Sequence, residues 1–177
     1  MVFADIPQFV EQKVCLSCDG CCRFSDDKTL WRPKVFPTEI KELNKQETIG
    51  KEGFTQDGYL KTIAHEQYHR CTFFNCKDNT CQIYFNRPFE CQIYPVILHQ
   101  HNRRIYVCVH LSCPYILEHH GTKKFEQYKE DLRRYFFDDN IYSFLRANAS
   151  SMGDYSVFSD ELEILFELQK ECEQDGC

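Results

Sequence analysis

The sequence has 177 residues, a net charge of −6 at pH 7 and twelve cysteines. This length suits one domain, or one domain with an appendage, and it is enough to bury an ordinary hydrophobic core. The acidic balance disfavours a nucleic-acid binder, which normally carries a basic surface. No apolar run approaches the roughly 20 residues of a membrane-spanning helix, so we expect neither nucleic acid nor a membrane as a partner.

The cysteine content indicates metal or redox chemistry. The first residues lack the basic and apolar regions of a secretory signal, which predicts a cytoplasmic protein. Thiols stay reduced in that compartment, so a disulfide framework is disfavoured. Glycine is scarce, with seven residues, and no glycine-rich nucleotide-binding motif occurs.

The N-terminal third predicts two short helices. Residues 7–14 form the first, with Pro7 in its first turn. Residues 38–43 form the second, with Thr38 as its cap. The polar stretch 45–58 contains three glycines and is expected to be a loop.

Four segments in the middle of the chain have the composition of strands. They are rich in aromatic and β-branched residues, which favours strand over helix. Pro95 limits the third segment to an edge strand, or to a strand that starts after the proline. The segments are residues 59–74, 82–85, 93–98 and 104–109.

The last third predicts helices. Apolar residues recur at helical spacing after Thr122, the expected cap, and the pattern resumes from Ile141. Ser159 is expected to cap a last helix. The predicted buried stripe of that helix is Leu162, Leu165, Phe166 and Leu168.

The expected fold class is therefore α+β. We expect a small, irregular, metal-centred core with short strands, and a C-terminal helical segment packed on it. The corresponding division is a cysteine-rich metal-binding domain over residues 1–120 and a helical segment over residues 121–177.

The first cysteine cluster has the spacing C-x2-C-x2-C-C. Cys15, Cys18 and Cys21 match the run that bacterial ferredoxins use for three corners of a [4Fe–4S] cluster. Cys22 follows directly. Neighbouring side chains in an extended segment point to opposite sides. We therefore expect Cys21 and Cys22 to face different metal sites, or one of them not to be a ligand.

The other cysteines are more widely spaced. Cysteine is often buried as a small apolar residue, and a buried or surface thiol is the favoured interpretation for four of them. These four are Cys76, Cys108, Cys172 and Cys177. Cys113 precedes a proline, as a further cysteine does in ferredoxins.

The ordered motifs between residues 15 and 115 resemble the CxxCxxCC, or YkgJ-like, family of zinc- or iron-chelating proteins. The resemblance is carried by residues 15–24, 71–74, 81–84 and 86–95 and by Cys113-Pro114. Gln92 departs from the pattern, because the family often has arginine there. Family members are described as iron–sulfur or zinc proteins, and a flagellin lysine-N-methylase carries a related domain. The resemblance implies eight ligands: Cys15, Cys18, Cys21, Cys22, Cys71, Cys81, Cys91 and Cys113.

Eight cysteines would complete two four-sulfur sites, which suit either [4Fe–4S] clusters or tetrahedral zinc. Thiolate softness does not decide between them. The ferredoxin-like spacing and the Cys-Pro pair favour one or two [4Fe–4S] clusters. The expected function is electron transfer or a redox accessory role with a redox partner protein. The alternatives are a structural zinc-binding interaction module and a protein-modifying enzyme related to the lysine methylase.

Other motifs are weaker. Residues 65–69 match H-E-x-x-H, a zinc-protease signature that needs a helix to place both histidines beside the glutamate. The segment is expected to be a strand, which loses that geometry. Arg87 is a candidate to neutralise an anionic thiolate cluster, or else part of a turn with Pro88. Four histidines are possible auxiliary ligands, although surface residues on loops are the favoured interpretation. They are His99, His101, His119 and His120.

Overall fold

The computed structural model describes residues 3–18, 20–45 and 53–170. This part of the chain is α+β, as predicted, with helices and three small antiparallel sheets. The chain divides into two compact units, Val10–Gln92 and Met1–Phe9 with Ile93–Cys177. An independent domain over residues 1–120 stays a prediction. No helix in the described ranges is long and apolar enough to cross a membrane.

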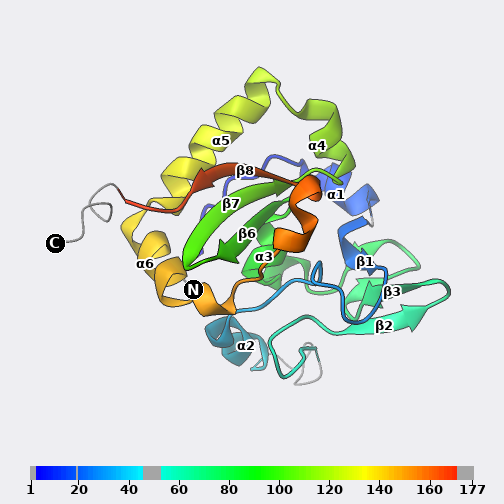
Figure 1. The fold of residues 1–177 in the computed structure, drawn as a ribbon. Coiled ribbons are helices and arrows are strands. Elements are labelled where there is room, and N and C mark those ends of the chain that lie inside the picture. Colours follow the sequence, from blue (N-terminus) through cyan, green and yellow to red (C-terminus); the bar gives the residue numbers. More distant parts are fainter. Residues whose placement is uncertain (1–2, 19, 46–52, 171–177) are drawn as a thin grey trace. The chain divides into compact units, whose positions relative to one another are not determined.

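The first unit, Val10–Gln92, is built from short elements (Figure 1). Its helices are α1 (Gln12–Ser17), α2 (Pro37–Leu43) and α3 (Phe89–Ile93), with 3-10 turns at Gly20–Cys22 and Tyr84–Asn86. Its strands are β1 (Arg23–Phe24), β2 (Thr62–His65), β3 (Tyr68–Cys71), β4 (Phe74–Asn75) and β5 (Thr80–Cys81). The first three strands form an antiparallel sheet in the order β1-β3-β2, and β4 pairs with β5.

Several expected elements of this unit are corrected. The first helix begins at Gln12, so Pro7 lies outside it. The predicted strand 59–74 is the β2–β3 hairpin, whose turn has Glu66 at φ 53°. The strand predicted over 82–85 is wrong: β5 ends at Cys81, and the following residues form a turn and then the 3-10 turn Tyr84–Asn86, in which the Asn86 N–H donates to the Ile83 carbonyl (2.8 Å).

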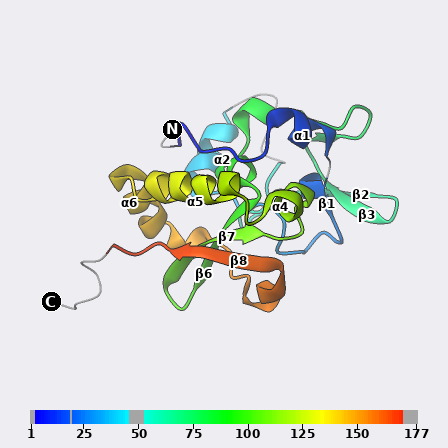
Figure 2. The same cartoon turned by 90° about the horizontal axis from the view of Figure 1, so that it is seen from above.

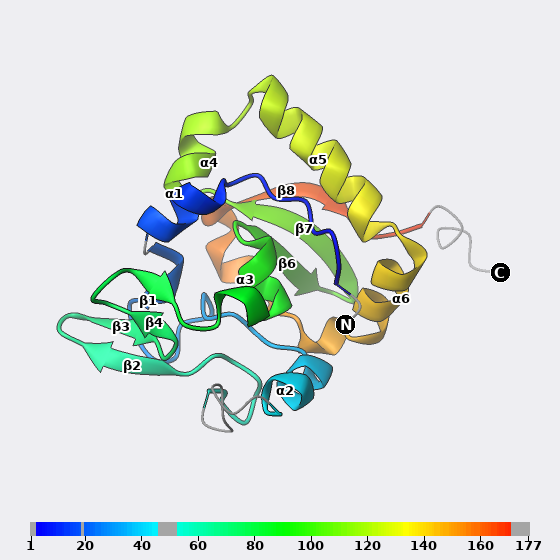
Figure 3. The same cartoon turned by 180° about the vertical axis from the view of Figure 1, so that it is seen from behind.

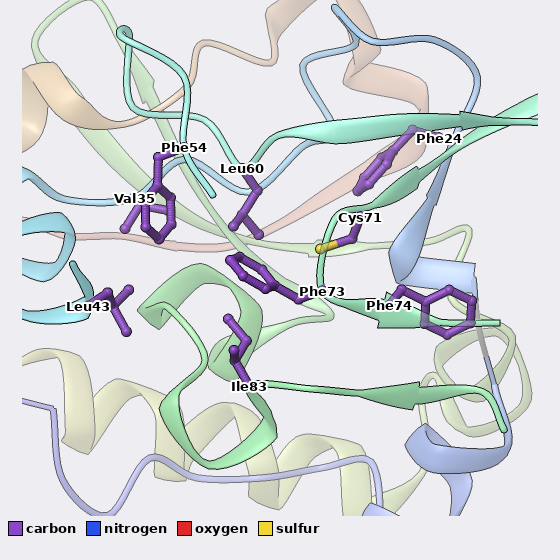
Figure 4. Close-up of a cluster of buried hydrophobic side chains, with 9 residues drawn as sticks. All are labelled: Phe24, Val35, Leu43, Phe54, Leu60, Cys71, Phe73, Phe74 and Ile83. Carbon is purple, nitrogen blue, oxygen red and sulfur yellow. The ribbon is translucent and has the colours of Figure 1, made fainter. Parts of the chain in front are cut away.

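A cluster of apolar side chains forms the core of this unit (Figure 4). Fully burying one such side chain contributes about 1.5–3 kcal/mol. Cys71 belongs to the cluster, and its sulfur points toward Leu60 and Phe73. The buried members are Phe24, Val35, Leu43, Phe54, Leu60, Cys71, Phe73, Phe74 and Ile83.

The buried carboxylate of Glu39 ties the starts of two helices together. Its Oε2 accepts from the Phe36 N–H (3.1 Å) and its Oε1 accepts from the Phe89 N–H (2.8 Å). Both donors are backbone groups at helix starts that lack a partner within their own helix. The cap of α2 is therefore Phe36 with Pro37 as first residue, and the predicted cap Thr38 lies inside the helix. Burial raises the pKa of Glu39 to about 7.

The second unit, Met1–Phe9 with Ile93–Cys177, contains a three-stranded antiparallel sheet in the order β6-β7-β8. Its strands are β6 (Val96–His101), β7 (Arg104–His110) and β8 (Leu162–Glu167). Its helices are α4 (Pro114–His119), α5 (Lys123–Phe136) and α6 (Asp139–Ala147), with 3-10 turns at Ala149–Ser151 and Ser156–Glu161. Helix α5 runs alongside the sheet, with α4 and α6 near its two ends (Figures 2 and 3).

Aromatic contacts hold this unit together. Phe136 of α5 packs against Phe166 of β8, with ring centroids 6.3 Å apart. Phe9 stacks on Tyr128 at 5.0 Å and contacts the buried Phe125 edge-on at 5.5 Å. The N-terminal segment thereby covers the apolar side of α5. The helix itself starts as predicted, because the Thr122 side chain accepts from the Phe125 N–H.

The last predicted helix is wrong. Ser159 lies within a 3-10 turn, and the residues that follow form β8. The spacing of the apolar residues fits a helical stripe, but pairing with β7 supplies the backbone hydrogen bonds, from His110↔Leu162 to Tyr106↔Glu167. A short apolar run is ambiguous between helix and strand, and tertiary pairing decides its structure.

The raised pKa of Glu39 predicts that the stability of the folded protein depends on pH. A carboxyl whose pKa rises on folding makes the folded state bind more protons, so between pH 4.5 and about 7 stability falls as pH rises, by up to about 3 kcal/mol. Glu39→Gln removes this titration and also leaves one backbone N–H without an acceptor, at a cost of about 1–3 kcal/mol. Chemical unfolding should therefore show a larger loss for the variant at pH 5 than at pH 8. An equal loss at both pH values would contradict this account.

Candidate metal centre

Five thiols from four separate segments interact electrostatically. The pKa of Cys91, in α3, is raised well above its usual value by burial and then by Cys71, Cys21 and Cys81. The pKa of Cys22 is raised first by a hydrogen bond with Cys21, then by burial, and then by the charges of Cys21, Cys71 and Cys91. We call Cys21, Cys22, Cys71, Cys81 and Cys91 the five-thiol cluster. The structure thus brings together five of the eight predicted ligands.

The adjacent pair in this cluster corrects one expectation. Cys21 and Cys22 lie in a 3-10 turn, so the extended geometry that would send their side chains to opposite sides is absent. Their thiols are hydrogen-bonded to each other. Both sulfurs are therefore available to one metal centre.

Burial makes the thiolate forms of the cluster costly. It raises the pKa of Cys71 to about 12, and it also raises the pKa of Cys81. Each ionised neighbour adds to the cost, because like charges in a buried site repel. The thiolate is nevertheless the form that binds metals. A cation among these sulfurs would displace their protons and remove the repulsion.

Backbone amides already stabilise two of the thiolates. The Phe73 N–H donates to the Cys71 sulfur and the Ile83 N–H donates to the Cys81 sulfur, and each bond lowers the thiol pKa. In both cases the donor lies two residues after the cysteine. The Gln82 N–H donates to the Phe73 carbonyl (2.9 Å), which joins the two turns. Hydrogen bonds to an ionised acceptor are among the stronger ones.

Besides Arg70, whose charge lowers the pKa of Cys71, a second cation acts on this cluster, and this is Arg87. Its charge lowers the pKa of both Cys81 and Cys91. Its guanidinium stacks on the Tyr84 ring at 4.0 Å, and its Nε donates to the Tyr84 carbonyl (3.1 Å). The Gln92 side chain donates to the Arg87 carbonyl (2.6 Å), so the residue that departs from the family pattern helps to hold Arg87.

Two further predicted ligands lie just before the cluster in sequence. Cys15 lies in α1 and Cys18 follows that helix, with its side chain exposed. The Cys18 sulfur is 3.7 Å from the position of a Cβ at Gly20, so it lies beside the turn that carries Cys21 and Cys22.

The remaining cysteines differ in their surroundings. Cys113, the eighth predicted ligand, is buried in the second unit, where it occupies the N-cap position of α4 before Pro114 without a side-chain capping hydrogen bond. Cys108 is fully buried in β7, which agrees with its interpretation as a core residue. Cys76 is half-buried against the core of the first unit and hydrogen-bonds to Tyr68. Outside the described residues lie Cys172 and Cys177.

The donor chemistry fits a thiophilic metal, although the ligands are not preassembled. Within residues 3–18, 20–45 and 53–170, no three Cys, His, Asp or Glu side chains are arranged to hold a metal ion. The cluster nevertheless offers five sulfurs, two backbone donors and two nearby cations, Arg70 and Arg87. Metal binding would therefore draw the thiols closer together, as in proteins whose metal binding is coupled to folding.

The H-E-x-x-H segment does not form a zinc site. It spans the β2–β3 hairpin, in which Ala64 pairs with His69 and His65 pairs with Tyr68. Paired residues share a face, whereas successive residues alternate. His65 and His69 therefore point to opposite faces, which excludes the zinc-protease arrangement.

The four candidate auxiliary histidines make other contacts in the second unit. The His99 Nδ1 accepts from the Tyr155 N–H (3.0 Å), and His101 pairs with Asp154 (3.0 Å). His119 stacks on a tyrosine ring at 4.0 Å, and His120 pairs with a glutamate. His99 is buried within β6, which corrects its interpretation as a surface residue, and His101 also lies in that strand.

Comparison with known proteins gives one family. The family model "CxxCxxCC: Putative zinc- or iron-chelating domain" matches residues 14–131, which include all eight predicted ligands. No curated protein and no solved structure matches the chain. The match covers more than half of the sequence and supports metal binding. The chain therefore belongs to the CxxCxxCC family of putative zinc- or iron-chelating domains.

Proposed function

We propose that the protein is an iron–sulfur protein that transfers electrons or serves as a redox accessory to a partner protein in the cytoplasm. The observation that carries this proposal is the five-thiol cluster, in which sulfurs from four segments lie within electrostatic reach of one another. The proposed ligands are Cys15, Cys18, Cys21, Cys22, Cys71, Cys81, Cys91 and Cys113.

Two features favour an iron–sulfur cluster. The spacing of Cys15, Cys18 and Cys21 is that of ferredoxins, whose cluster potentials depend on hydrogen bonds to sulfur and on solvent exposure. Both influences are present here, as backbone N–H bonds to Cys71 and Cys81 and as an apolar core around Cys71. The proximity of Cys21 to Cys22 supports one [4Fe–4S] centre at the five-thiol cluster, and a second would need the remaining cysteines.

Structural zinc is the second candidate. Cys71 belongs to the apolar core, so a metal bound there would stabilise that core directly. Four cysteine thiolates around zinc are a common structural site. Such a protein would serve as an interaction module and would have no redox activity.

Metal analysis distinguishes the two candidates. Protein purified without oxygen should be brown, with visible absorption, and should contain iron and acid-labile sulfide in equal amounts. A colourless protein with stoichiometric zinc and no sulfide would overturn the iron–sulfur proposal and support the zinc site.

Cys71 and Cys108 form a matched pair of variants. Both thiols are buried, and burial raises the pKa of each to about 12, so serine should cost similar stability at either position. Cys71→Ser should weaken metal binding by more than the roughly 10–100-fold typical of residues that only contact a ligand. Cys108→Ser should keep the wild-type metal content. Equal metal loss in the two purified variants would show that Cys71 is not a ligand.

Cys113 tests whether the second unit contributes a ligand. This residue occupies the N-cap position of α4, where serine is favourable, so Cys113→Ser should leave the helix intact. If Cys113 is a ligand, the variant should lose metal while its far-ultraviolet circular dichroism stays unchanged. Wild-type metal content would remove Cys113 from the ligand set without affecting the five-thiol cluster.

A further inference from the structure

One face of the β1-β3-β2 sheet carries polar side chains beside Cys71. Thr62 of β2 pairs directly with Cys71 of β3, and Ala64 pairs with His69. Phe24 of β1 also pairs with His69, from the other side of β3. Because paired residues share a face and alternate residues return to it, Thr62, His69 and Cys71 point to the same face.

The Thr62 hydroxyl is buried on this face and lacks a hydrogen-bond partner among the described residues. A buried hydroxyl without a partner costs about 1–3 kcal/mol, so native structures rarely keep one without a reason. Directly opposed residues in an antiparallel pair have Cβ atoms about 4.5–5.5 Å apart. Thr62 and Cys71 are therefore direct cross-strand neighbours, and the Thr62 hydroxyl lies on the same side of the sheet as the Cys71 sulfur.

The state of that sulfur determines whether it attracts the hydroxyl. A neutral thiol is a weak acceptor, whereas a thiolate is a strong one. The Phe73 N–H already donates to the Cys71 sulfur from the following turn. Thr62 lies on the neighbouring strand, so its hydroxyl would reach the same sulfur from a second direction.

We propose that the Thr62 hydroxyl donates a hydrogen bond to the Cys71 sulfur when that sulfur is a metal-bound thiolate. Thr62 is then a positioning residue that orients Cys71 and tunes the metal centre. This inference rests on the proposed metal-thiolate function, for either iron or zinc. His69 is less well placed for this role, because it lies two residues, or about 7 Å, along β3 from Cys71.

The role has a specific energetic signature. In the metal-free protein, Thr62→Val replaces an unsatisfied hydroxyl by a methyl group of the same shape, so stability should stay equal or rise. In the metal-bound protein, the same change removes a hydrogen bond to a ligand, and such outer contacts are worth about 10–100-fold in metal affinity. A residue with only a structural role would not separate these two quantities.

The test uses Co²⁺ as a spectroscopic probe of thiolate binding. Thr62→Val should bind Co²⁺ at least about 10-fold more weakly in competition with a chelator. Its sulfur-to-cobalt absorption band should move to longer wavelength, because the sulfur electrons are less stabilised. Thr62→Ser keeps a hydroxyl and should restore both properties. Thr80→Val is the matched control. It should leave the Co²⁺ affinity and the absorption band unchanged, because the Thr80 hydroxyl donates to Asp78 (2.6 Å) and not to a sulfur.

The outcomes separate the inference from the function on which it rests. Wild-type affinity and an unmoved band in Thr62→Val would overturn the role of Thr62 and leave the metal centre standing. Loss of stability in metal-free Thr62→Val, together with lower affinity, would assign the hydroxyl a structural role and overturn the inference. Absence of any thiolate-to-cobalt band in the wild-type protein would overturn both the inference and the proposed function.

Discussion

The first unit depends on one physical constraint, which is that thiols buried side by side cannot all ionise without a neighbouring positive charge. Burial and mutual repulsion raise the pKa values of Cys71, Cys81 and Cys91, and a hydrogen bond with Cys21, followed by the same two effects, raises that of Cys22. Arg70 and Arg87 supply positive charges, which oppose part of this cost. A metal would supply the rest, and the free energy released would then contribute to the stability of the folded unit.

The short elements of this unit bring cysteines from separate segments within electrostatic reach of one another. Cys22 ends a 3-10 turn, Cys71 ends β3, Cys81 ends β5, and Cys91 lies within α3. Glu39 holds the start of α3 through the Phe89 N–H, and therefore helps to fix Cys91. The apolar core and the proposed centre thus share a residue, because Cys71 belongs to both.

Local patterns were sufficient where local interactions determine the structure. The β-branched residues of 104–109 correctly predicted β7, and Thr122 correctly predicted the start of α5. The pattern from Leu162 to Leu168 failed because pairing with β7, rather than spacing, determines β8. The strand expected at 82–85 failed because the chain bends back after the Ile83 N–H bonds the Cys81 sulfur.

For the candidate site, the sequence indicated which cysteines to consider but not which groups would surround them. Motif spacing selected the candidate cysteines, because residue type and separation can be read directly from the sequence. Strand register and turn geometry determine the partners of those cysteines. Thr62 opposite Cys71 follows only from the β2–β3 pairing, and the donors Phe73 and Ile83 follow only from the turns. Residues 65–69 show the reverse case, in which a matching motif is divided by a hairpin turn.

The central claim is that sulfurs of the five-thiol cluster share one metal centre. X-ray absorption spectroscopy at the edge of the bound metal tests it most directly, because it reports the identity of the nearest atoms. This account predicts a nearest shell of about four sulfur atoms at about 2.3 Å for zinc, and a sulfur shell for iron. A nearest shell dominated by nitrogen or oxygen would contradict it.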